Sequence, residues 1–223
     1  MMPFPGGIEA TANATLLFSL AAAVVYGLIL NTRETLLRSA VKTFAVALLA
    51  VLVVVQGGPL LLVSALALSA LGDAFLSRDG DKAFLGGLAS FLAAHLAYIG
   101  LFWLAGAGFE ALWQPWRLVL AAAMAVFAAV MLVMLWRRVA PDLRLPVAAY
   151  AAAILGMGVS ALTLDNAWII AGAILFMASD GLLAAEKFLV AAISPYREWM
   201  RHAVWALYYA AQLTITLGFL LSA

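Results

Sequence analysis

Apolar residues fill long stretches of the chain, and charged or Gly/Pro-containing breaks divide these stretches into eight segments. A membrane-spanning helix needs about 20 mostly apolar residues, and each segment approaches that length. The breaks are short and carry turn residues, as at Gly57-Gly58-Pro59 and Arg78–Lys82, so none can hold a soluble domain. The pattern predicts an all-α polytopic membrane helix bundle, a single integral membrane domain over residues 1–223. Its predicted transmembrane helices are Ala14–Leu30, Ser39–Gln56, Leu60–Ser77, Ala83–Leu104, Trp116–Trp136, Leu145–Leu162, Trp168–Lys187 and His202–Leu221.

Basic residues are concentrated on one side of this predicted bundle. All but one of the 12 Lys and Arg residues lie at connections from an odd-numbered to an even-numbered segment, and Arg117 is the exception. Because Lys and Arg in short loops are retained in the cytoplasm, both termini are predicted to lie outside it. The residues before the first segment include Glu9 and no Lys or Arg, so we expect this segment to remain as a helix and not to act as a signal peptide.

Composition supports a membrane protein and removes several function classes. The chain is 67% hydrophobic and 10% charged, which leaves too little polar surface for a soluble domain. A formal net charge of +1 argues against a nucleic-acid partner. The absence of Cys excludes thiol catalysis and Cys-ligated metals, and two His residues exclude a three-His zinc site. We therefore expect no metal or cofactor, and a multi-pass location in the cell membrane, which is the inner membrane if the source is bacterial.

Two acidic residues, Asp73 and Asp180, lie inside apolar segments. An ionised carboxylate within a spanning helix costs several kcal/mol unless it is paired, neutralised or hydrated, so such a residue is a functional candidate. At 1.5 Å per residue, Asp73 lies about 8 Å from Arg78 and Asp180 about 10 Å from Lys187 along their helices. The two carboxylates are therefore predicted to lie at similar depth near the cytoplasmic side, where they could meet.

When the sequence is aligned with itself at an offset of about 107 positions, Asp73 aligns with Asp180 and His95 aligns with His202. Two four-helix halves of the same orientation would form a parallel 4+4 pseudo-repeat. The alternative is that helices rich in Ala and Leu match by composition alone. The two histidines are predicted not to be equivalent, because His202 lies beside Arg201 at the membrane surface.

Structural roles are also open for these polar residues. Each aspartate could form an ion pair with Lys42 or an arginine, or accept a hydrogen bond from a Ser or Tyr hydroxyl. A lone His such as His95 is often a packing residue, and Lys42 could extend to the membrane surface. Tyr208, Tyr209 and Gln212 could serve in hydrogen bonds between helices.

An ordered set of motifs runs along most of the chain. The set comprises Lys42 in Val-Lys-Thr, Gly72-Asp73, Phe84–Phe91 followed by His95 and Tyr98, Phe176–Asp180 with Lys187-Phe188, and Tyr208–Gln212. In these motifs the chain resembles the YhhN family, the lysoplasmalogenases. The resemblance implies an eight-helix layout and hydrolysis of the vinyl ether bond of lysoplasmalogens, which releases a fatty aldehyde and glycerophosphocholine or glycerophosphoethanolamine. The implied partners are a lysophospholipid substrate and membrane lipids.

Two carboxylates are suited to this chemistry, because one can protonate the vinyl carbon while the other stabilises the oxocarbenium ion or activates water. We expect the pair to share one proton. The candidate catalytic residues are Asp73, Asp180 and His95, and the candidate substrate-binding residues are Lys42, Tyr98, Ser179, Tyr208, Tyr209 and Gln212. The headgroup phosphate is predicted to lie among Lys42, Arg38, Arg78 or Arg201.

Two other functions are compatible with the same residues. In a small proton-coupled transporter the aspartates would form a proton relay. The third alternative is a non-catalytic lipid-binding membrane protein. Aldehyde release by the purified protein would distinguish an enzyme from both.

Overall fold

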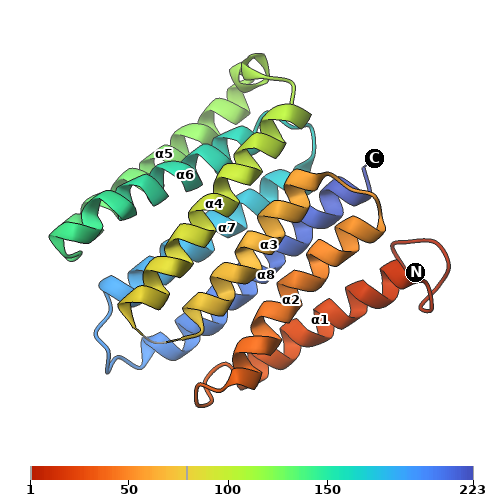
Figure 1. Ribbon diagram of the computed structural model, residues 1–223. Helices are drawn as coiled ribbons and strands as arrows, with labels where there is room; N and C mark the ends of the chain where they lie inside the picture. The colour runs from red at the N-terminus through yellow and green to blue at the C-terminus, as the bar shows by residue number, and fades with distance from the viewer. Residues whose placement is uncertain (1, 79, 223) are drawn as a thin grey trace.

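The computed structural model describes residues 2–78 and 80–222, which form eight α-helices joined by short connections (Figure 1). Asp79, in the predicted break at Arg78–Lys82, lies outside the described residues. Two connections contain short 3-10 helices, η1 at Phe109–Trp113 and η2 at Pro141–Leu143. The helices are α1 Thr11–Ile29, α2 Leu36–Val55, α3 Leu60–Leu76, α4 Asp81–Ala105, α5 Pro115–Trp136, α6 Arg144–Ala161, α7 Ala167–Phe188 and α8 Tyr196–Leu220.

The predicted all-helical membrane bundle is confirmed. Seven helices are long and apolar enough to cross a membrane, and the eighth, α3, is an apolar helix of 17 residues. At 1.5 Å per residue α3 is about 25 Å long, and it lies between α2 and α4. The chain is therefore a multi-pass membrane protein.

Local sequence signals explain several helix ends. Thr35 and Asn166 precede α2 and α7, and their side-chain oxygens accept backbone N–H groups of the first helical turn. Pro115 begins α5, where its missing N–H has no cost. The largest difference from the predicted spans is at α8, which begins at Tyr196 and not at His202. Charged residues mark where a helix leaves the apolar layer, but they do not end the helix.

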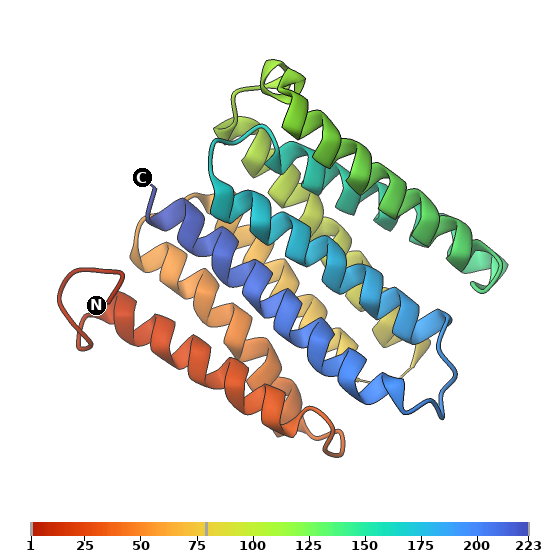
Figure 2. The same cartoon turned by 180° about the vertical axis from the view of Figure 1, so that it is seen from behind.

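Consecutive helices run antiparallel, so both termini lie at the same end of the bundle (Figure 1). Which side of the membrane this end faces stays a prediction. Within each half, α1–α4 or α5–α8, each helix packs on the next one along the chain. The fourth helix of each half also packs on a helix of the other half. Helix α4 packs on α3 and also on α6, as α8 packs on α7 and also on α2 (Figures 1 and 2). The 4+4 pseudo-repeat stays a prediction, and this exchange of fourth helices is compatible with it.

Two glycines allow α3 and α4 to approach closely. A Cβ atom at Gly72 would lie 2.6 Å from the Phe91 ring, and a Cβ atom at Gly87 would lie 2.5 Å from Leu76. Small residues at such contacts are typical of membrane helix pairs, where van der Waals packing drives association. The contact also fixes the Phe91 ring against Gly72, the residue that precedes Asp73.

Arg117, the basic residue that did not follow the charge pattern, is buried at the start of α5. Its Nη1 donates to the Leu162 carbonyl at 2.7 Å, and its Nη2 pairs with Asp165. These contacts connect α5 to the α6–α7 connection at the end of the bundle that carries the termini.

Replacing Arg117 with Met should lower the unfolding temperature of the detergent-purified protein. The variant leaves the Leu162 carbonyl without its donor, a loss of about 1–3 kcal/mol. Arg138→Met removes an exposed arginine at the other end of the bundle and serves as the control. Equal unfolding temperatures for the two variants would contradict the structural role of Arg117.

Candidate active site

Asp73 is buried on α3, where two donors from other helices reach its carboxylate. Lys42 Nζ of α2 lies 3.0 Å from Oδ1, and the Tyr208 hydroxyl of α8 donates to Oδ2 at 2.7 Å. The Asp73 side chain is 1% exposed and that of Lys42 is 14% exposed. The ammonium and the hydroxyl donor favour the ionised form of this carboxylate, whereas its burial opposes ionisation.

Asp180 on α7 has a different environment. The Tyr150 hydroxyl of α6 donates to Oδ2 at 2.5 Å, and His95 Nε2 of α4 lies 3.7 Å from the same oxygen. His95 is fully buried, and its Nδ1 lies 2.6 Å from the Phe91 carbonyl. Because a carbonyl only accepts, Nδ1 must carry the proton, which leaves a lone pair on Nε2 when the ring is neutral. This lone pair faces Asp180, and within residues 2–78 and 80–222 Nε2 has no hydrogen-bond partner.

Both aspartates line one polar cavity of about 330 Å³. No hydrogen bond joins their carboxylates among the residues that the structure describes, because each one is held by its own partners. In both cases one partner comes from the preceding helix and one from the fourth helix of the opposite half. A proton shared by the two carboxylates stays a prediction.

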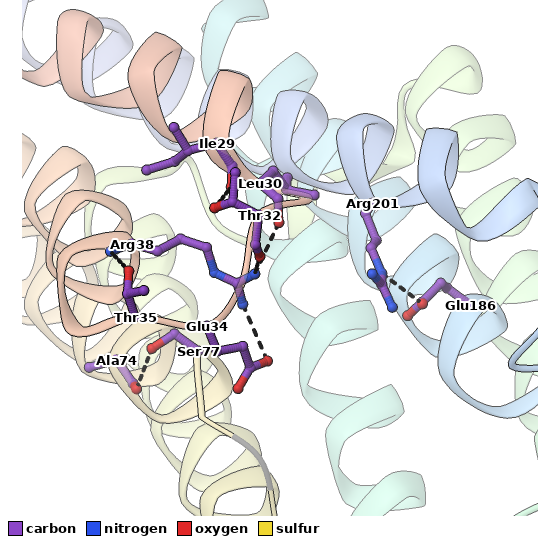
Figure 3. Close-up of polar contacts among 10 residues, drawn as sticks. All are labelled: Ile29, Leu30, Thr32, Glu34, Thr35, Arg38, Ala74, Ser77, Glu186 and Arg201. Carbon is purple, nitrogen blue, oxygen red and sulfur yellow. Dashed lines mark hydrogen bonds and ion pairs between the residues drawn. The ribbon is translucent and has the colours of Figure 1, made fainter.

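The mouth of the polar cavity is rich in charged side chains. Arg38, Lys42 and Arg201 line it, as predicted for a phosphate-binding region, and Arg78 lies outside the lining that the described residues form. Arg38 Nη1 donates to the carbonyls of Leu30 and Thr32, and its Nη2 lies 3.3 Å from Glu34 (Figure 3).

A second ion-paired cluster lines the same mouth. Glu186, at the end of α7, accepts from Arg197 at 2.6 Å and from Arg201 at 3.3 Å, and Figure 3 shows the latter contact. Lys187 and Arg197 also line the cavity. The mouth therefore presents several cations whose positions are fixed by carboxylates and backbone carbonyls.

An apolar groove of about 110 Å³ borders the polar cavity and is lined by α4, α5, α6 and α7, together with Leu76 at the end of α3. Asp180 lines both, and Tyr150 contributes to the groove. The two spaces also share the side chains Leu76, Phe84, Phe91, Leu183 and Lys187. Asp180 is thus a carboxylate at the junction of a charged space and an apolar one.

The remaining predicted site residues are divided between the cavity and the core. Ser179 and Tyr208 line the polar cavity, where the Ser179 hydroxyl donates to the Val204 carbonyl at 3.0 Å. Tyr98 donates to Gln212 in the core, and Tyr209 hydrogen-bonds Ser19. These last three predicted residues, Tyr98, Tyr209 and Gln212, line neither space in the described part of the chain. For Tyr209 and Gln212 these contacts are the interhelical hydrogen bonds that the sequence left open as an alternative, and Tyr98 is the partner of Gln212.

Sequence reasoning missed Tyr150, which contacts both Asp180 and His95. Its ring packs against the His95 imidazole with centroids 5.2 Å apart. The available signal was the single aromatic residue, Tyr150, of the apolar segment Leu145–Leu162. Within residues 2–78 and 80–222, no group of three His, Cys, Asp or Glu residues is placed to hold a metal ion.

Comparison with known proteins agrees with the motif resemblance. The chain is 36% identical over 162 residues to a lysoplasmalogenase of Mycobacterium bovis, and 37% identical over 164 residues to lysoplasmalogenase TMEM86B of Homo sapiens. These alignments cover 71% and 73% of this chain but 59% and 64% of the relatives, so the chain spans less than two thirds of their length. No solved structure gives a significant match. The YhhN family model matches residues 37–219, most of the sequence, and the protein therefore belongs to the YhhN family.

Proposed function

We propose that this protein hydrolyses the vinyl ether bond of lysoplasmalogens, as the names of its relatives suggest. The observation that supports this most strongly is the position of Asp180, a carboxylate where a charged cavity meets an apolar groove. A lysoplasmalogen has the same division, because its vinyl ether joins a polar glycerophospho group to a hydrocarbon chain. The expected products are a fatty aldehyde and glycerophosphocholine or glycerophosphoethanolamine.

The two aspartates would have separate roles in this reaction. Asp180, in its carboxylic acid form, donates a proton to the vinyl carbon next to the ether carbon, and the electron pair of the double bond forms the new C–H bond. The resulting oxocarbenium ion is stabilised by the Asp73 anion, which Lys42 and Tyr208 hold in place. Water adds to the ether carbon and loses a proton to a carboxylate, and the hemiacetal then collapses to the aldehyde and a glycerol hydroxyl.

His95 and Tyr150 would position Asp180 for the proton transfer. Tyr150 donates to Oδ2, and the His95 lone pair faces the same atom at 3.7 Å. After the first step, the His95 Nε2 lone pair can accept the proton that the attacking water loses and pass it on to the Asp180 carboxylate, because Nδ1 already donates to the Phe91 carbonyl.

The charged mouth would bind the headgroup. Arg38, Lys42 and Arg201 lie around the cavity and can pair with the phosphate. This places the reactive bond one or two helical turns below the Arg38–Arg201 level, at the depth of the aspartates. We further propose that the protein acts in the cell membrane, which is the inner membrane if the source is bacterial.

A panel of lysolipids offered to the purified protein in detergent tests the proposal. Vinyl ether, alkyl ether and acyl lysolipids with the same headgroup should be compared by aldehyde and glycerophospholipid release. We expect aldehyde from the vinyl ether substrate alone. Release of fatty acid from the acyl lipid would indicate an esterase, and binding without turnover of any lipid would favour a transporter or a non-catalytic lipid-binding protein.

A further inference from the structure

We propose that the apolar groove between α4, α5, α6 and α7 is the binding site for the hydrocarbon chain of the lysolipid. This inference rests on the proposed function and adds where the chain lies. The occupant is one unbranched alkenyl chain, whose vinyl ether end lies at Asp180 and whose headgroup lies in the polar cavity.

The groove is continuous with the polar cavity. Five side chains besides Asp180 line both spaces, so a molecule that reaches the carboxylate from the charged side also meets the groove. The shared wall includes Phe84, Phe91 and Leu183, which offer an apolar surface directly beside the carboxylate. A ligand with a charged part and an apolar part fits both spaces at once.

The chemistry and the dimensions of the groove also suit a hydrocarbon chain. Its walls follow α7 from Met177 to Phe188, a rise of about 16 Å at 1.5 Å per residue. Ala128, Ala151 and Ala184 provide the space, since larger side chains at these positions would fill it. In the described part of the chain, the polar side chains on the groove wall are Asp180, Tyr150 and Lys187. The Tyr150 hydroxyl donates a hydrogen bond to Asp180.

An ordinary lipid-facing surface does not need these features. The outer faces of α1, α2 and α5 expose apolar side chains such as Phe18, Val54 and Val133. The groove instead leads to Asp180, whose side chain is 13% exposed, and to the His95 Nε2 atom 3.7 Å from it, which has no hydrogen-bond partner among the described residues. A lipid chain that enters the groove therefore has one end at Asp180 and His95.

Filling the groove should change chain selectivity without removing the reaction. Ala151→Phe places a phenyl ring in the groove, and the KM for a long-chain lysoplasmalogen should rise roughly tenfold or more, because each displaced methylene loses its burial. A substrate with a short chain should keep a KM and kcat close to those of the unsubstituted protein. Ala149→Phe, exposed on the other side of α6, is the matched control and should leave both substrates unaffected. Ala184→Leu, on α7, provides a second substitution if the first one does not fold.

Photo-crosslinking gives a measurement that does not need turnover. An alkyl ether lysolipid with a diazirine in its chain should label the groove segments of α5 and α6, and Ala151→Phe should reduce this labelling while Ala149→Phe should not. Uniform labelling of all outer helix faces, unchanged by Ala151→Phe, would overturn the groove assignment. If the unsubstituted protein labels at the groove but releases no aldehyde, the proposed reaction fails and the chain-binding site stands.

Discussion

Replacing Asp180 with Asn should reduce aldehyde release by roughly a hundredfold to ten-thousandfold, the usual contribution of a positioned general acid. The amide keeps the shape of the side chain and can still accept from the Tyr150 hydroxyl, but it has no proton to donate to the vinyl carbon. The measurement is kcat with the vinyl ether lysolipid, made on protein whose unfolding temperature and elution volume match those of the unsubstituted chain.

Asp142→Asn is the matched control for this variant. It removes an exposed acid in the α5–α6 connection, outside both spaces, and should retain full activity. A folded Asp180→Asn protein with unchanged kcat would show that Asp180 is not the proton donor.

The ion pair between Lys42 and Asp73 gives the second large effect. Asp73→Asn leaves the Lys42 ammonium without its carboxylate partner, and breaking a buried pair from one side costs about 3–5 kcal/mol of unfolding free energy. We therefore expect a lower unfolding temperature together with a loss of activity of roughly a hundredfold or more.

The double variant Lys42→Met/Asp73→Asn separates the two consequences. It removes both charges, so most of the lost stability should return. Activity should remain low, because the anion beside the oxocarbenium ion is still missing. Recovery of activity along with stability would mean that Asp73 serves only to neutralise Lys42.

The sequence predicted the helices well because their apolar segments are separated by short charged or turn-forming breaks. Asp73 and Asp180 were identifiable for the related reason that carboxylates are rare inside such segments. The contacts of Asp73 with Lys42 and Tyr208 were among the alternatives, but the sequence alone could not choose among several possible donors.

Other parts of the site depend on packing between distant helices. Tyr150 reaches Asp180 because α6 lies beside α4 and α7, an arrangement that segment lengths do not specify. The same is true of the apolar groove, which needs four helices to form. Tyr98 and Gln212 were candidates because they are polar residues in apolar segments, but residue type does not show where a side chain lies. In the structure they hydrogen-bond each other in the core.

The exchange of the fourth helices has a consequence for the ancestry of such a chain. If the halves descend from one duplicated unit, two identical copies would once have given both aspartates the same partners. Once the copies were joined in one polypeptide, each half could mutate by itself. In the present sequence Ala149 stands at the position that corresponds to Lys42, and Leu101 at the one that corresponds to Tyr208. Gene fusion would thus have allowed one aspartate to keep a fixed cation and the other to specialise in proton exchange.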